Sequence, residues 1–287
     1  MALEYGILLA LASMVAWGLY DFSIAIVSRK IGALRTSLWV TVITAVAFAV
    51  LLSTYSIPAL TPAQLLLMLF VALAAIVGIL SFTKAFKTGQ VSIVSPIVSA
   101  WVVVTIFLSI ILLNEKLDLI QSAGIVAIIL GGILISFKWS DLVRVRWKNA
   151  TKGVKYALVA ACASGLYYFS LSVLTSQIGW FPAAFLYNIP MIAMFIVVGA
   201  ATKRRLAFPI DKYGALTVVV GLLSFAGVLT YSAGVSYSYT ALVAAIVSAS
   251  PILTVVLAMA LLKERPEYSQ LFGIAMVIAG LITVSFW

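Results

Sequence analysis

The 287-residue chain is too apolar for an ordinary water-soluble domain, because 64% of its residues are hydrophobic and only 9% are charged. Its 18 basic and 8 acidic residues give a net charge of +10, but most basic residues lie in short gaps between apolar runs, so the excess indicates membrane topology rather than nucleic-acid binding. The sequence has no histidine, which excludes imidazole bases and histidine metal ligands, and its single cysteine, Cys162, excludes an intrachain disulfide.

Ten apolar runs follow one another along the chain. A helix that crosses a bilayer needs about 20 apolar residues. We therefore expect an all-α membrane protein with ten transmembrane helices. The predicted spans are 4–28, 36–53, 63–84, 91–113, 118–137, 153–176, 182–200, 213–234, 240–262 and 268–286.

The positions of lysine and arginine predict the orientation of these spans. Seventeen of the eighteen basic residues fall in loops on one side, and Lys116 alone falls on the side of the amino terminus. By the positive-inside rule the basic loops are cytoplasmic and both termini are external. We expect an integral protein of a prokaryotic-type inner (plasma) membrane.

The two halves of the sequence are related. Residues 18–23 match residues 165–170 at an offset of 147, and residues 91–137 match residues 240–286 with 18 identities in 47 positions. Each half holds five spans, and because five is odd the second copy enters the membrane from the opposite side. Inverted repeats of this kind are how many secondary transporters build a site near the bilayer midplane.

This duplication predicts the domain organisation. The first repeat is expected at 1–140 and the second at 153–287, joined by a basic cytoplasmic linker at 141–152, with the two inverted five-helix repeats enclosing a central cavity. Positions that are basic in one half are neutral in the other: Arg29 corresponds to Ser176. This exchange is what two oppositely inserted copies require.

Several stretches resemble the EamA repeat of the drug/metabolite transporter (DMT) superfamily. They are Ala-Trp-Gly-Leu-Tyr-Asp-Phe at 16–22, Val-Ser-Ile-Val-Ser-Pro-Ile-Val at 91–98 and Leu-Leu-Asn-Glu-Lys at 112–116. The resemblance covers nearly the whole chain. It implies a ten-helix carrier whose cavity is lined mainly by helices one, three, four, six, eight and nine, and which moves amino acids or other small metabolites, often as export. Many members are described with cytoplasmic termini, whereas the charges here favour external ones.

Asp21 is the only acidic residue well inside a predicted span. A carboxylate at this depth is costly and usually faces a cavity or a partner. Asp21 is therefore a candidate to hold a substrate ammonium group or a coupling proton. The alternative is a residue near the helix end that pairs toward Arg29.

Other residues are candidates for substrate contact or gating. Lys84 either reaches the membrane interface or meets an anionic group. Pro96 and Pro251 interrupt backbone hydrogen bonding in the fourth and ninth spans, next to a gate or as simple kinks. Glu115 and Glu264 mark matching loop ends, where ion pairing or helix termination is expected. Six aromatic residues are candidates to line the cavity, and an aromatic belt is the alternative for those close to the membrane interfaces: Trp17, Tyr20, Trp101, Tyr167, Tyr168 and Tyr231.

These features favour a transporter over an enzyme or a channel. Intramembrane aspartyl proteolysis needs two acids, and serine proteolysis needs a base that the chain lacks. No filter motif or ring of acids indicates a channel. We expect a secondary transporter, an exporter of small organic metabolites with amino acids favoured, working by alternating access with protons as a candidate coupling ion, without cofactor, metal or nucleic acid. A lipid or lipid-precursor flippase of the same fold is the alternative.

Overall fold

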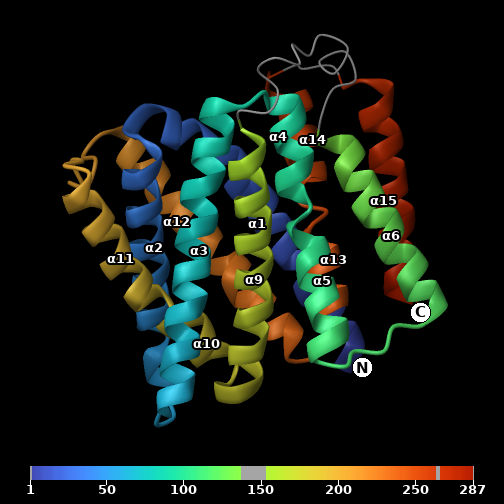
Figure 1. Ribbon diagram of the computed structural model, residues 1–287, viewed down its shortest axis with the longest axis horizontal. Helices are drawn as coiled ribbons and strands as arrows, with labels where there is room; N and C mark the ends of the chain where they lie inside the picture. Colours follow the sequence, from blue (N-terminus) through green and yellow to red (C-terminus); the bar gives the residue numbers. More distant parts are fainter. Residues whose placement is uncertain (1, 137–152, 263–265, 287) are drawn as a thin grey trace.

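The computed structural model describes residues 2–136, 153–262 and 266–286, and these residues form a bundle of helices (Figure 1). The predicted linker at 141–152 and Glu264 lie outside the described residues. The first half contains α1 (Ala2–Ile31), α2 (Ala33–Val50), the short 3-10 helix η1 (Leu52–Thr54), α3 (Pro62–Thr88), α4 (Val91–Ser99), α5 (Trp101–Leu112) and α6 (Leu119–Ile135). The second half contains α9 (Val154–Ile178), α10 (Trp180–Leu186), α11 (Asn188–Ala201), α12 (Lys212–Val235), α13 (Thr240–Val247), α14 (Pro251–Leu262) and α15 (Tyr268–Phe286).

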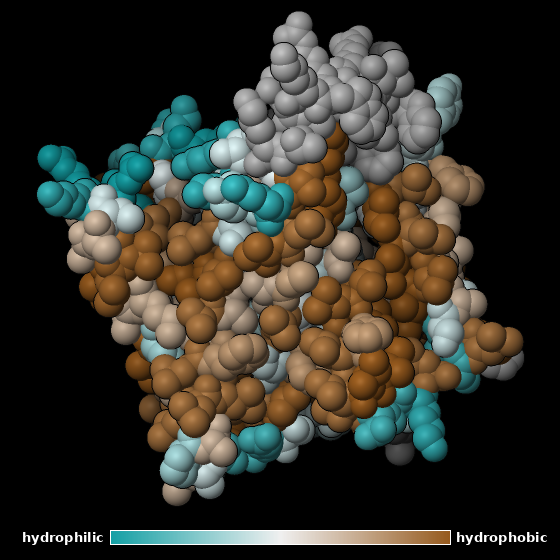
Figure 2. Space-filling view, viewed as in Figure 1, coloured by the Kyte–Doolittle hydropathy of each residue, from teal (hydrophilic) through white to brown (hydrophobic). Residues whose placement is uncertain are grey.

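The predicted ten-helix, all-α membrane fold is confirmed. Among the described residues, nine segments are long and apolar enough to cross a membrane, and the shorter apolar helix Leu119–Ile135 completes the set of ten. Large apolar side chains cover the outside of the bundle, such as Leu66, which is 68% exposed, and Phe107, which is 61% exposed. Figure 2 shows this apolar belt, with hydrophilic residues gathered toward the upper edge and at the lower edge. Such a surface is solvated by lipid rather than by water.

Local sequence signals determine where several helices begin. Thr61 accepts a hydrogen bond from the Gln64 backbone, and the Gln64 side chain accepts one from the Thr61 backbone. Asp118 and Gln121 form the same reciprocal capping box at the start of α6. These caps satisfy backbone N–H groups that a helix start leaves without partners.

The two halves run in opposite directions through the bundle. Figure 1 marks both chain termini at the lower end, so α1 runs upward, whereas α9 starts at the upper end and runs downward. We call the lower end the terminal end. The opposite end carries Arg29, Lys87, Arg204 and Arg205, and we call it the basic end.

Equivalent residues make equivalent contacts, which supports the inverted duplication in atomic detail. The Thr254 hydroxyl donates to the Gly18 carbonyl at 3.3 Å, and the Thr105 hydroxyl donates to the Gly165 carbonyl at 3.1 Å. Thr105 and Thr254 are repeat partners, as are Gly18 and Gly165. One contact is therefore the rotated copy of the other, as a pseudo-two-fold axis between the halves requires.

Helices α6 and α15 meet along a glycine seam on this axis. A Cβ atom at Gly131 would lie 2.6 Å from the Gly273 carbonyl oxygen, and one at Gly273 would lie 2.8 Å from the Gly131 oxygen. Gly124 and Gly280 form the same kind of contact further along the two helices. A Cβ atom at Gly124 would lie 3.1 Å from the Gly280 carbonyl oxygen, and one at Gly280 would lie 2.6 Å from the Gly124 oxygen. Only glycine lets the two backbones approach so closely.

The seam leads to a stability prediction. Gly131→Ala is expected to destabilise the protein by about 1–3 kcal/mol, because the new methyl group would overlap the Gly273 backbone. Gly132→Ala is the matched control, since a Cβ atom there would be 3.9 Å from its nearest neighbour, the Ser248 oxygen. Thermal unfolding of the two purified variants checks this. Equal melting temperatures for the variants would contradict it.

Candidate functional site

A cavity of about 290 Å³ lies between the two halves. Its walls come from α1, α2, α3, α4, α5, α9, α11, α12, α13 and α14, so both repeats contribute. Of the residues predicted from the sequence, seven line it: Trp17, Tyr20, Asp21, Trp101, Tyr167, Tyr168 and Pro251. The structure thus brings these seven together, and their role in substrate binding remains a prediction.

Among the described residues that line this cavity, Asp21 is the charged one. Its side chain is exposed rather than packed in protein, and because Asp21 is a lining residue, that exposed surface faces the cavity. The Ser250 hydroxyl lies within hydrogen-bonding reach of the carboxylate. The described lining includes neither lysine nor arginine. The carboxylate is therefore available to a cationic group or a proton brought from outside the protein.

Aromatic rings surround Asp21. The Trp17 and Tyr20 rings meet edge to face with centroids 4.9 Å apart, and the Trp101 and Tyr168 rings stack at 4.2 Å. Aromatic faces attract cations and also bury apolar surface. The wall thus offers a favourable surface to a solute that combines a positive charge with an apolar body.

Hydroxyl and amide groups complete the lining. Asn188 is buried, and its amide nitrogen donates to the carbonyl oxygens of Ala184 and Phe185 at 2.8 and 3.3 Å. The Tyr167 and Tyr187 hydroxyls share a hydrogen bond of 3.0 Å. The sequence analysis did not propose Asn188 for the site.

Two broken helices border the cavity. The fourth span is interrupted at Ala100, between α4 and α5, and the ninth is interrupted at Ser248–Ser250, between α13 and α14. These positions are equivalent in the two repeats. Discontinuous helices at a repeat interface commonly build transporter sites, because the free backbone groups face a cavity.

The prolines do not share that symmetry. Pro251 begins α14 directly after the second break, a position where its missing N–H costs little. Pro96 lies within α4, four residues before the break at Ala100, and is absent from the described lining of the cavity. The first break therefore does not fall at its proline, and a gating role for either proline remains a prediction.

The cavity continues toward the basic end. A second space of about 550 Å³ shares Tyr20, Asp21 and Ser99 with the first and extends to Ser28 and Phe86. The path from Asp21 thus leads to the end of the bundle where α1 and α3 finish.

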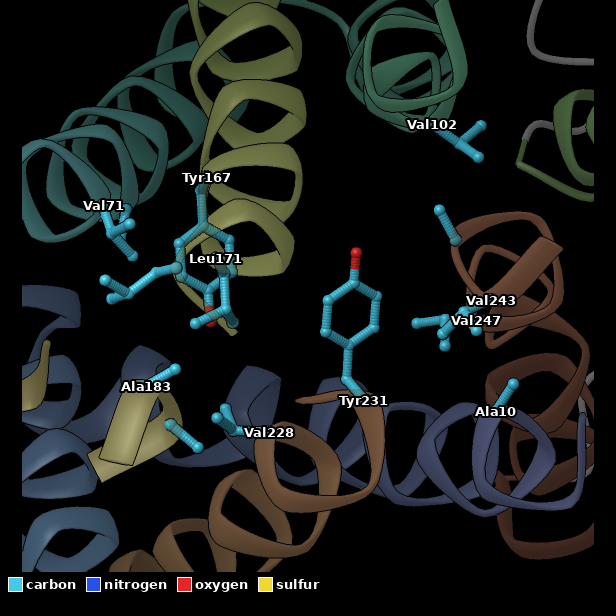
Figure 3. Packing of buried hydrophobic residues seen from close by; sticks show 14 of the residues in the cluster. Ala10, Val71, Val102, Tyr167, Leu171, Ala183, Val228, Tyr231, Val243 and Val247 are labelled. Atoms are coloured by element: carbon cyan, nitrogen blue, oxygen red, sulfur yellow. The ribbon is translucent and has the colours of Figure 1, made fainter. Parts of the chain in front are cut away.

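The terminal end is closed by packed side chains. The Tyr231 hydroxyl donates to the Tyr168 carbonyl at 3.2 Å and shares a hydrogen bond of 3.3 Å with the Ser172 hydroxyl. Figure 3 shows Tyr231 lying between Leu171 of α9 and Val243 of α13, in one buried cluster. Tyr231 is therefore fully buried in this closure and does not line the cavity, although it contacts Tyr168, which does.

Glu115 links the α5–α6 loop to the start of α13 at this closed end. Its carboxylate accepts hydrogen bonds from the backbone N–H groups of Thr240 and Ala241, at 2.6 and 2.9 Å. These are the first two residues of α13, where the helix dipole favours a negative charge. Glu115 precedes α6 in the chain, so the contact ties the α5–α6 loop of the first repeat to the second repeat. The sequence showed that Glu115 and Glu264 stand at matching loop ends, but it did not show which helix Glu115 caps.

Lys84 lies away from the cavity. Its ammonium group sits 4.5 Å from the centre of the Tyr156 ring, near the basic end. It lines a separate pocket with other basic residues. Lys84, the residue predicted to meet an anionic substrate group, is thus outside the described lining of the central site.

Comparison with known proteins agrees with this architecture. Residues 4–137 and 151–286 each match the EamA-like transporter family. A curated relative, an uncharacterized transporter of Archaeoglobus fulgidus, is 23% identical over 219 residues, which make up 76% of this chain and 74% of the relative. A solved crystal structure of 16% identity shares the fold, with a TM-score of 0.77 over 98% of this chain and 96% of that chain. The chain therefore belongs to the EamA-like transporter family of the drug/metabolite transporter superfamily and is an integral membrane transporter.

Proposed function

We propose that the protein is a secondary transporter for small organic solutes that carry an amino group and an apolar body, with amino acids as the favoured class. The observation that carries this proposal is the Asp21 carboxylate in a cavity walled by aromatic rings. The ammonium group would pair with Asp21, and the apolar part would lie against Trp101 and Tyr168. A substrate carboxylate would be met by a neutral hydroxyl donor of the lining, such as Ser164.

The transport cycle would be a rocking motion of the halves around the cavity. The present arrangement is closed at the terminal end by Tyr231 and extends from Asp21 toward the basic end. Exchanging the roles of the repeats would give the opposite arrangement, because the contacts of one half recur in the other. Asp21 can bind a proton or a substrate cation but not both at once, which provides a route to proton coupling.

We place the basic end in the cytoplasm of a prokaryotic-type inner membrane, with both termini external. The support is the asymmetry of lysine and arginine between the ends. In this orientation the described state exposes the cavity to the cytoplasm, the side from which an exporter takes up its substrate.

Counterflow in proteoliposomes tests the proposal. Liposomes loaded with one unlabelled solute are expected to accumulate the labelled form, saturably, for amino acids with apolar side chains and for related amines. Neutral sugars should not accumulate, because they offer Asp21 no cation. Protein-free liposomes are the control. Movement of a labelled lipid between leaflets without saturable solute counterflow would overturn the proposal in favour of a flippase.

A further inference from the structure

A third cavity, of about 620 Å³, lies at the basic end between the α1–α2 junction, α3 and the end of α11. We call it the basic pocket. The described residues that line it include no aspartate or glutamate. They include five cations: Arg35, Lys84, Lys87, Arg204 and Arg205. None of these five lines the central cavity, so the basic pocket has a different chemistry from the site at Asp21.

The pocket is amphipathic. Besides the cations, its lining includes the apolar residues Leu34, Leu80 and Val198. Ile79 and Thr83 of α3 line both this pocket and the space leading from Asp21, so the two are neighbours. A pocket lined by both cations and apolar side chains suits a molecule with an anionic head and a hydrocarbon tail better than a free, fully hydrated anion.

The loop that carries two of the cations is held in place by the protein. The Arg35 side chain donates to the Ala207 carbonyl at 2.5 Å, and the Trp39 indole donates to the Leu206 carbonyl at 2.7 Å. The Trp39 ring also meets the Phe208 ring edge to face at 5.0 Å. Arg204 and Arg205 therefore project from a segment anchored on α2.

The corresponding place in the other repeat is filled instead of open. Gly32 and Gly179 are repeat partners, and both have a φ of 90°, so the chain turns in the same way at each. Beside Gly179, however, the Tyr55 ring stacks on Phe181 at 4.2 Å and meets Trp180 at 5.0 Å. The fold therefore does not require a charged cavity at this junction, and the basic pocket is a property of the basic end alone.

From these observations we infer that the basic pocket binds the phosphate headgroup of an anionic phospholipid. The guanidinium groups of Arg204 and Arg205 would contact phosphate oxygens through paired N–H donors, with Lys84 and Lys87 contributing charge from α3. The acyl chains would lie along Leu80 and Val198. The bound lipid would adjoin the space that leads to Asp21, without entering it.

Native mass spectrometry of the full-length protein tests this inference without any transport assay. Detergent-purified protein would be offered an equal mixture of phosphatidylglycerol and phosphatidylcholine with the same acyl chains. Wild-type protein is expected to retain phosphatidylglycerol preferentially. Arg204→Gln/Arg205→Gln is expected to lower this retention about tenfold or more, because each cation near an anionic lipid contributes roughly a factor of five.

Matched variants separate a built pocket from general positive charge. Lys203→Gln/Lys212→Gln removes two charges at the same end from residues outside the pocket lining, and retention should stay within about twofold of wild type. Lys84→Gln/Lys87→Gln removes two other lining charges and should reproduce the loss, so the result does not depend on the folding of one variant.

The inference fails if all three pairs lose phosphatidylglycerol equally, or if none does. It also fails if inorganic phosphate at the same concentration displaces the lipid, because the pocket would then recognise a free anion. Loss of solute counterflow with lipid retention intact would contradict the proposed function and leave this inference standing.

Discussion

Asp21→Asn is expected to lower the rate of solute counterflow by about 10- to 100-fold, because a hydrogen bond to a charged group contributes roughly 1.5–3 kcal/mol. Asparagine keeps the size and one acceptor of the carboxylate but cannot neutralise a substrate ammonium group. The Ser250 hydroxyl and the aromatic rings remain, so the cavity itself should persist. Insertion into the membrane should be unaffected, as removing a charge from a spanning helix is favourable.

The pH dependence of the same variant distinguishes a binding role from a structural one. In the wild type, lowering the pH protonates Asp21 and should weaken binding of a cationic substrate, so transport affinity falls toward acid pH. The variant has no group to protonate at this position, so its transport affinity should stay constant at the acid pH values where the wild-type affinity falls. The measurement is counterflow at a series of symmetrical pH values.

Asp211→Asn is the control for this substitution. Asp211 caps α12 at the basic end, and asparagine caps a helix about as well as aspartate. It should therefore transport like the wild type. If Asp21→Asn kept both the wild-type rate and the wild-type pH profile, Asp21 would have no part in the mechanism.

Glu115→Gln is expected to favour opening of the terminal end. The substitution keeps one acceptor for the α13 N–H groups but removes the charge that the helix start favours, a loss of about 1–2 kcal/mol. That loss would shift the ratio of open to closed forms by roughly 5- to 30-fold. The readout is the rate at which a membrane-impermeant thiol reagent modifies a cysteine placed at Ala10, a residue fully buried in the closure.

The labelling experiment needs a cysteine-free background and a control substitution. Cys162 is exposed, so the probe is introduced into a Cys162→Ala background. Asp118→Asn changes another acid in the same loop while preserving the cap of α6, and should leave the labelling rate unchanged. An equal rise with Asp118→Asn, or no rise with Glu115→Gln, would show that Glu115 does not stabilise the closure.

The fold could be predicted from the sequence because each helix that crosses a bilayer requires a long apolar run, which is easy to recognise. In the part of the chain that the structure describes, the ten apolar runs correspond to nine segments long enough to cross a membrane and one shorter apolar helix. The odd number of predicted spans in each half predicted the inversion that the Gly18–Thr254 and Gly165–Thr105 contacts display. The glycines at 124, 131, 273 and 280 form the seam between α6 and α15.

Side-chain positions were harder to predict, because these helices are apolar on nearly every face and periodicity does not show which face meets the cavity. Tyr231 therefore resembled a cavity residue, whereas it packs in the closure. The Glu115 contact joins residues 125 positions apart, and no local pattern encodes it. The break at Ala100 follows the symmetry of the backbone rather than the position of Pro96.

The glycine seam is self-complementary. Gly131 of α6 contacts Gly273 of α15, and their repeat equivalents, Gly280 and Gly124, make the same contact with the two helices exchanged. Two identical five-helix chains could use the same surface on both sides, as in an isologous dimer. A single-repeat ancestor would thus have possessed its assembly interface before gene fusion. The linker then needed only to join subunits that already fitted, and each descendant could afterwards acquire its own residues, the acid in one and the tyrosine Tyr168 in the other.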